Sequence, residues 1–205
     1  MANAIFPFNS KITYEQRKKA MMQEPRLIWL TGLSGAGKTT LALRLEQYFF
    51  SKGFKVFILD GDNVRNGLCN DLGFSEESRK ENLRRVAEVA TLMLDAGLII
   101  ICAFISPNAE DRKAIKNIVG EQRFIEVYVS CPVEICEERD VKGLYAKART
   151  GIIPNFTGVS APYDAPVSPD IELRTADETV EESVQKIIQL VEPVITYKVM
   201  SEIDA

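Results

Sequence analysis

The feature that most constrains this chain is a glycine-rich segment placed directly after an apolar run. Residues 32–39 read Gly-Leu-Ser-Gly-Ala-Gly-Lys-Thr, and they follow Leu27–Thr31, a run typical of a buried strand. Glycines in this pattern let backbone amides point at phosphate oxygens. Lys38 would then lie along the β- and γ-phosphates, and the Thr39 hydroxyl would bind Mg²⁺. Because a strand precedes the segment and helical spacing follows it, we interpret it as a P-loop and not as a chance turn.

Strand and helix patterns alternate along most of the remaining chain. Further strands are expected at residues 55–59, 98–104, 124–130 and 170–173. Helices are expected at residues 39–51, 76–95, 109–119, 132–139 and 178–194. The last helix should begin with a capping box of Thr179 and Glu182. Since the strands are continuously apolar, we predict an α/β fold of the P-loop NTPase type, a three-layer sandwich with a parallel five-stranded sheet, helices on both faces and a lid.

The lid is the one long stretch without periodicity. Gly, Pro, Lys, Thr and Tyr dominate from about residue 140 to 169, and a loop of this length in a compact domain is usually functional. Residues 1–24 are interpreted as an N-terminal extension that contains a short helix opened by a capping box of Thr13 and Gln16.

The charge balance limits the partners of the chain. Its 25 basic and 29 acidic residues give a formal net charge of −4, so no broad positive field attracts nucleic acid. The longest apolar run, residues 98–105, is too short to span a bilayer. We therefore expect neither a nucleic-acid nor a membrane partner. The sequence contains no histidine, which removes imidazole as a general base and as a zinc ligand.

The cysteines bear on the cellular compartment. None of the four belongs to a C-x-x-C pair, and two of them lie in apolar strand-like runs. We predict buried, reduced thiols. The N-terminus also lacks a basic-then-apolar signal pattern, so the predicted location is cytoplasmic.

Polar residues cluster where the predicted strands end. The second strand closes in Asp60-Gly61-Asp62-Asn63, in which one carboxylate could hold Mg²⁺ through water and the other could orient or deprotonate a hydroxyl. The alternative is an ordinary Asp-Gly-Asn turn. Arg65 and Arg79 have guanidinium forks that suit a phosphate or sulfate group, although solvated helix charges are the default interpretation.

The lid carries cations together with an aromatic side chain. These are Arg139, Lys142, Lys147, Arg149 and Phe156. A flap of this composition would close over nucleotides, expel water and bring positive charge to a transferring phosphoryl group. The alternative is an exposed basic loop.

Together these segments resemble the adenylyl-sulfate kinase (APS kinase) family over roughly residues 25–195. The matching stretches are Gly32-Leu-Ser-Gly-Ala-Gly-Lys38, Leu59-Asp-Gly-Asp-Asn-Val-Arg65, Asp71-Leu-Gly-Phe-Ser75, Arg79 with Glu81-Asn82, Phe104-Ile-Ser-Pro107, Arg139-Asp-Val-Lys-Gly-Leu-Tyr145, and Phe156-Thr-Gly158 with Pro162-Tyr163. The P-loop is shared by many ATPases, whereas the second and sixth stretches together are far more specific. One departure is Asn108, where the family usually has Tyr.

The resemblance implies an activity and an assembly. Residues 25–205 would form a P-loop kinase domain that transfers the γ-phosphate of ATP to the 3′-hydroxyl of adenosine 5′-phosphosulfate (APS). The products would be ADP and 3′-phosphoadenosine 5′-phosphosulfate, the activated form of sulfate. ATP is the implied co-substrate, Mg²⁺ the implied metal and a homodimer the implied assembly, with residues 5–8 as one candidate for packing on a partner subunit.

The family motifs also imply roles for individual residues. The implied catalytic residues are Lys38, Asp60, Asp62 and Ser106. The implied ATP-binding residues are Gly32, Leu33, Ser34, Gly35, Ala36, Gly37, Lys38, Thr39, Thr40 and Arg139, with Thr39 as the metal ligand and Arg139 near the ATP adenine. The implied acceptor-binding residues are Asp62, Arg65, Phe74, Arg79, Asn82, Ile105, Ser106, Lys142, Leu144 and Phe156, in which Phe74 and Phe156 sandwich the adenine.

Several hypotheses stay open at this point. Some descriptions of the family treat Ser106 as a phosphorylated intermediate, but with no histidine to activate it we favour direct in-line transfer. One alternative function is another small-molecule P-loop kinase, acting on a nucleoside monophosphate or a sugar acid. It would have no reason to combine the segments around Asp60, Ser106 and Phe156. A nucleotide-sensing protein without turnover would have little need of Asp62.

Overall fold

The fold was analysed in a computed structural model that describes residues 10–198. Its five strands are β1 (Leu27–Thr31), β2 (Val56–Asp60), β3 (Ile99–Ala103), β4 (Phe124–Ser130) and β5 (Ile171–Arg174). They form one sheet in the order β2-β3-β1-β4-β5, and every pairing is parallel. The predicted parallel five-stranded sheet is therefore confirmed, with the strand before the P-loop at its centre.

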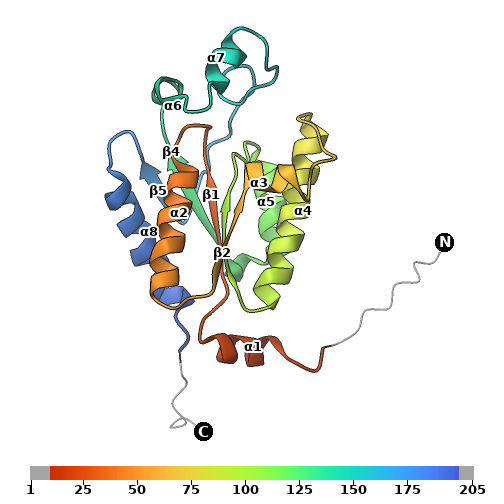
Figure 1. The fold of residues 1–205 in the computed structure, drawn as a ribbon, viewed down its shortest axis with the longest axis vertical. Helices are drawn as coiled ribbons and strands as arrows, with labels where there is room; N and C mark the ends of the chain where they lie inside the picture. The colour runs from red at the N-terminus through yellow and green to blue at the C-terminus, as the bar shows by residue number, and fades with distance from the viewer. Residues whose placement is uncertain (1–9, 199–205) are drawn as a thin grey trace, which may run out of the picture.

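Helices cover both faces of this sheet. They are α1 (Tyr14–Met21), α2 (Lys38–Ser51), α3 (Gly61–Asn66), α4 (Glu76–Asp95), α5 (Ala109–Val119), α6 (Val133–Arg139), α7 (Leu144–Arg149) and α8 (Val180–Ile195), with a 3₁₀ turn at Glu121–Arg123. Alternate residues of β1 explain the layers. Ile28 and Leu30 pack with α2 and α8, whereas Leu27 and Trp29 pack with α4 and α5. Figure 1 shows these helix pairs on opposite sides of the sheet, which confirms the three-layer sandwich.

The predicted helices are all present, and their starts lie within two residues of the predicted ones. α4 and α5 span the predicted residues. Both predicted capping boxes form: Thr13 Oγ1 accepts a hydrogen bond from the Gln16 amide at 3.2 Å, and Thr179 Oγ1 accepts one from the Glu182 amide at 3.2 Å. All four cysteines are buried and free, as predicted. Between residues 10 and 198, no helix has the length and apolar character that crossing a membrane requires.

Two short helices were not predicted. The segment after Asp60, for which an ordinary turn was the alternative interpretation, begins α3, because the Asp60 carboxylate caps this short helix by accepting from the Asp62 amide at 3.0 Å. The lid is not without regular structure, since it holds α7, whose first amides donate to the Asp140 carboxylate. A helix of six residues is too short to show a helical period in the sequence.

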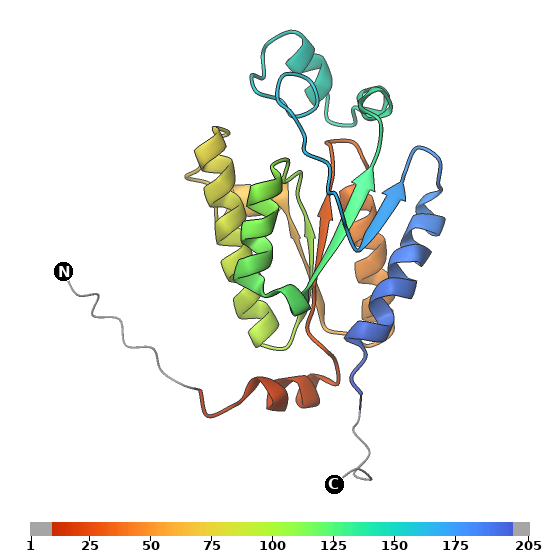
Figure 2. The ribbon, with the colours of Figure 1, turned by 180° about the vertical axis from the view of Figure 1, so that it is seen from behind.

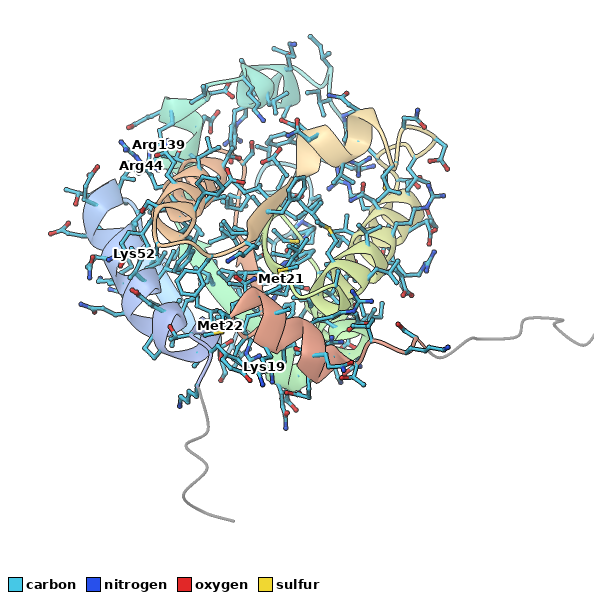
Figure 3. All side chains as sticks on the ribbon, turned by 60° about the horizontal axis from the view of Figure 1, so that its bottom comes forward. Lys19, Met21, Met22, Arg44, Lys52 and Arg139 are labelled. Carbon is cyan, nitrogen blue, oxygen red and sulfur yellow. The ribbon has the colours of Figure 1, made fainter. Side chains whose placement is uncertain are left out.

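The lid and the N-terminal helix lie at opposite ends of the sheet. Figures 1 and 2 place α6 and α7 beyond the carboxyl ends of the strands and α1 beneath their amino ends. Figure 3 shows Met21 and Met22 at the end of α1 on this lower side. The buried Gln23 side chain attaches α1 by donating to Lys55 O at 3.0 Å and Gly97 O at 2.8 Å. Residues 5–8 lie outside the described residues, and the division at residue 24 stays a prediction.

Candidate active site

The P-loop lies between the central strand and α2. Gly32 has φ +152°, and a Cβ at this position would stand 2.4 Å from Val129 O, so no larger residue fits against β4. Gly37 precedes α2 and has no side chain to cap it, whereas Ser75, Asn108 and Thr179 cap the helices that they precede. The first amides of α2 therefore have no capping side chain and can donate to an anion. Free amides of this kind bind phosphate at the N-terminus of a helix.

Lys38 lies inside the loop. Its side chain is buried, and Nζ donates to Gly32 O at 2.9 Å and Leu33 O at 2.6 Å. Burial lowers the pKa of Lys38 to about 8. The ammonium group thus occupies the centre of the loop with carbonyl oxygens as partners, and phosphate oxygens would be stronger partners for its charge.

Thr39 and Asp60 provide oxygen ligands beside the loop. Thr39 Oγ1 donates to Asp60 Oδ2 at 2.9 Å, which joins the start of α2 to the end of β2. Within residues 10–198, no group of three or more His, Cys, Asp or Glu residues could hold a metal ion. Mg²⁺ is commonly held by one or two protein oxygens together with nucleotide phosphates and water. The pair therefore fits Mg²⁺ that arrives with ATP.

The predicted base faces the lid. Lys142, at the end of the loop between α6 and α7, donates from Nζ to Asp62 Oδ2 in α3. Arg65, one helical turn further along α3, donates to Gly73 O at 2.9 Å, and its guanidinium carbon stands 4.4 Å from the centre of the Phe74 ring. The structure therefore gathers Asp62, Arg65, Phe74 and Lys142 on the side of the P-loop that faces α4.

Arg79 joins the start of α4 to the lid. Its guanidinium group donates to Phe74 O at 2.9 Å, Asn155 O at 2.8 Å and Thr157 Oγ1 at 3.1 Å. Asn82, one turn along α4, is buried, and its Oδ1 has no hydrogen-bond partner among the described residues. A buried amide oxygen without a partner is costly, so this side chain is suited to receive a donor from a ligand.

The two predicted adenine-binding rings differ in their surroundings. Phe156 is buried, and its ring meets the Tyr145 ring edge to face at 5.0 Å between centroids. Phe74 is 67% exposed with Arg65 over one face. Arg79 contacts the backbone of Phe74 and the side chain of Thr157, next to Phe156. The adenine sandwich stays a prediction, with one ring already packed and the other accessible.

Ser106 is buried and fully engaged by its neighbours. It has φ +39° and is 2% exposed. Its hydroxyl donates to Thr31 Oγ1 at 2.8 Å and accepts from Trp29 Nε1 at 3.0 Å. Thr31 Oγ1 also donates to Ile105 O at 2.8 Å. This packing holds the Ile105–Ser106 backbone in place and gives the hydroxyl a structural partner on both sides.

Three side chains support the P-loop carbonyls and the adjoining turn, and two of them, Tyr145 and Thr175, had no role in the sequence-based prediction. Tyr145 donates from its hydroxyl to Ser34 O at 2.9 Å, and Thr175 donates to Ala36 O at 2.9 Å. Arg139 contacts Gly35 O at 3.3 Å and Thr175 O at 2.7 Å. Tyr145 belongs to one of the stretches that match the APS kinase family, whereas no sequence motif pointed to Thr175. Among the remaining predicted residues, Thr40 is exposed on α2, and the Leu144 amide donates to Asp140 at 2.8 Å.

The departure at Asn108 has a structural explanation. Its side-chain oxygen accepts from the Glu110 amide at 2.8 Å and the Asp111 amide at 3.2 Å, so it caps α5. Asparagine is among the best residues for this position, and tyrosine has no oxygen that reaches these amides.

The fold and this site define a class. The chain has a P-loop after the central strand, carboxylates at the end of β2 and the start of α3, and a cationic lid. These are the parts of a P-loop kinase, which transfers phosphate to a second bound molecule. The sequence matches the family described as adenylylsulphate kinase over residues 24–174, and the chain belongs to that family. It is accordingly a phosphotransferase of sulfate assimilation that uses ATP and acts on a hydroxyl group of adenylyl sulfate.

Individual relatives agree with this assignment. The adenylyl-sulfate kinase of Bacteroides thetaiotaomicron is 51% identical over 96% of this chain and 98% of its own length. The enzyme of Shewanella sp. (strain MR-7) is 53% identical over 92% and 91%. The solved APS kinase of Mycobacterium tuberculosis, in complex with AMPPNP and APS, is 44% identical, with a TM-score of 0.80 over 82% of this chain and 98% of that chain.

Proposed function

We propose that the site transfers the γ-phosphate of ATP directly and in line to the 3′-hydroxyl of APS, with Asp62 as the orienting or accepting carboxylate. The observation that carries this proposal is a chain of contacts that joins the P-loop helix to the Asp60–Asp62 pair and this pair to Lys142 of the lid. A hydroxyl held beside Asp62 would face the phosphate bound by Lys38 and the start of α2. Phosphoryl transfer of this kind depends on positioning and on stabilisation of charge.

The donor half of the site consists of the P-loop and its supports. The backbone amides of residues 32–40 would bind the phosphates, and Lys38 would lie along the β- and γ-oxygens. Thr39 and, through water, Asp60 would hold Mg²⁺, which would neutralise charge on those phosphates. Arg139, which already contacts the loop at Gly35, would lie near the ATP adenine.

The acceptor half lies between α3, α4, the turn after β3 and the lid. Arg65 and Arg79 would bind the phosphosulfate, since guanidinium groups match its oxygens. Asn82, whose Oδ1 has no hydrogen-bond partner within residues 10–198, would bind it too. Phe74 and Phe156 would hold the adenine, and Ile105 and Ser106 would line the site through their backbone. Lys142 and Leu144 would close over it from the lid. The proximity of Lys142 to Asp62 supports this arrangement.

A coupled assay of ADP release tests the proposal. The purified chain is given ATP and Mg²⁺ with APS, AMP or gluconate as acceptor, beside an Asp62→Ala variant. We expect ADP release with APS and its loss in Asp62→Ala. Release with AMP or gluconate but not with APS would establish another small-molecule kinase. Unchanged turnover in Asp62→Ala would remove this carboxylate from the mechanism.

We also propose a homodimer in the cytoplasm. A relative from Thiobacillus denitrificans has been solved as a hexameric APS kinase, and it is 30% identical over 84% of this chain and 30% of that chain, with a TM-score of 0.64. The four free, buried cysteines suit a reducing compartment. Sedimentation equilibrium at micromolar concentration tests the assembly, and a mass of one chain would contradict the dimer.

A further inference from the structure

Arg112 is a buried arginine outside the proposed contacts with ATP and APS. It lies in the first turn of α5, and only 5% of its surface is exposed. Burying a guanidinium group is expensive unless each donor is used. The positions of its partners therefore indicate what this residue does.

Its guanidinium group contacts three separate segments, two through hydrogen bonds and one through an ion pair. Nη1 donates to Ser106 O at 2.8 Å, in the turn after β3 that would line the acceptor site. Nη2 donates to Asp164 O at 2.6 Å. Asp164 lies in the last part of the lid, residues 159–169, which leads back to β5 and is called the lid arm below. Nε stands 3.1 Å from Glu126 Oε1 on β4. One planar group thus joins the acceptor turn, the lid arm and the sheet.

The lid arm and the acceptor turn are joined by further contacts around this arginine. The Asp164 amide donates to Pro107 O at 2.8 Å, and the Ala109 amide donates to Asp164 Oδ2 at 3.2 Å. Tyr163 stacks on Tyr128 with 6.0 Å between ring centroids, and its hydroxyl stands 2.9 Å from Thr31 Oγ1. Thr31 in turn contacts Ser106 and Ile105. The base of the lid and the acceptor turn therefore form one connected unit.

We propose that Arg112 is a positioning residue for the acceptor, because it fixes the Ile105–Ser106 turn to the returning arm of the lid. The inference rests on the proposed acceptor site. Ser106 has an unfavourable positive φ, which neighbouring contacts must hold in place. Without Arg112 the turn and the lid arm can move independently. The acceptor is then bound more weakly, while the P-loop, which Arg112 does not touch, keeps its affinity for ATP.

Two substitutions distinguish the carbonyl contacts of Arg112 from its ion pair with Glu126. Arg112→Lys keeps a charge for Glu126 but loses the fork that reaches two carbonyl oxygens at once. Glu126→Gln removes the charged partner and leaves both carbonyl contacts. Arg123→Lys is the matched control. Arg123 also donates to a carbonyl, Val119 O at 2.9 Å, and pairs with a carboxylate, Asp95 at 2.6 Å, but it directly precedes β4 at the amino end of the sheet.

Steady-state kinetics with each substrate varied, together with calorimetric titration of AMPPNP, test the proposal. We expect Arg112→Lys to raise the KM for APS about tenfold or more, with AMPPNP affinity within about twofold of wild type. Arg123→Lys should change neither. An unchanged KM for APS, or an equal loss of APS and AMPPNP binding, would overturn the positioning role.

Hydrogen exchange provides a readout that does not depend on activity. The Asp164 amide, bonded to Pro107 O, should exchange faster in Arg112→Lys and not in Arg123→Lys. Unchanged exchange there would also overturn the proposal. If wild type shows no turnover with APS, the proposed function fails, and the exchange experiment still tests whether Arg112 holds the lid arm.

Discussion

Lys142 in the lid and Asp62 in α3 form an ion pair although 80 residues separate them in the sequence. The two side chains are 58% and 67% exposed, so the pair contributes only about 0–1 kcal/mol to stability. A contact this weak is easily exchanged for contacts with a substrate. The ion pair matters for the geometry of the site and not for stability, because it places Lys142 of the lid next to Asp62, the predicted base.

Removing this lid cation should affect catalysis without affecting the fold. We expect Lys142→Met to lower kcat/KM for APS about tenfold to 100-fold, because the variant loses charge stabilisation during transfer. The free energy of unfolding should stay within about 0.5 kcal/mol of wild type. Lys147→Met is the matched control, since Lys147 is also an exposed lid lysine. Equal losses in the two variants would show that only the overall charge of the lid matters.

Replacing the carboxylate should separate chemistry from binding. Asp62→Asn keeps the shape of the side chain but removes its ability to accept a proton, and we expect kcat to fall about 100-fold to 10,000-fold. AMPPNP affinity should change little, because Lys38 and the start of α2 are untouched. Single-turnover kinetics and titration of AMPPNP measure the two effects. A fall in AMPPNP affinity that accounts for the whole loss of activity would place Asp62 in donor binding.

The buried lysine predicts a pH dependence of ATP binding. Burial lowers the pKa of Lys38 to about 8, and bound phosphates favour the charged form. Below about pH 7 the lysine is protonated with or without ATP, so affinity should not depend on its titration. Above pH 8 binding must take up a proton, and affinity should fall by up to about tenfold per pH unit.

Calorimetric titration of AMPPNP at several pH values tests this dependence. Lys38→Arg serves as the control, because a guanidinium group stays charged throughout the range. Its affinity should be flatter with pH than that of wild type, whatever its absolute value. Equal slopes for the two proteins would assign the dependence to a different group.

The buried Ser106 predicts direct transfer. Because its hydroxyl is engaged by Trp29 and Thr31, Ser106→Ala should retain activity within about tenfold of wild type. Transfer from ATP with a chiral γ-phosphate should proceed with inversion at phosphorus. Retention of configuration, together with inactivity of Ser106→Ala, would instead establish a phosphoserine intermediate.

The sequence predicted the regular parts of this fold well. The strands around Leu27 and Phe124 and the helices that begin near Glu76 and Ala109 are long or strongly periodic, and their boundaries were close to those observed. The short helices after Asp60 and Gly143 were missed. Their six residues depend on capping by Asp60 and Asp140 rather than on an apolar period.

The sequence alone was enough to predict the nucleotide site, because a P-loop acts through local backbone geometry that Gly32 to Thr39 encode in one continuous segment. Only the tertiary structure determined three other features: the pairing of Lys142 with Asp62, the burial of Ser106 and the three contacts of Arg112. Each of these joins segments far apart in the chain. Local preference carries no information about such contacts, whereas packing of the lid against the carboxyl ends of the strands brings them together.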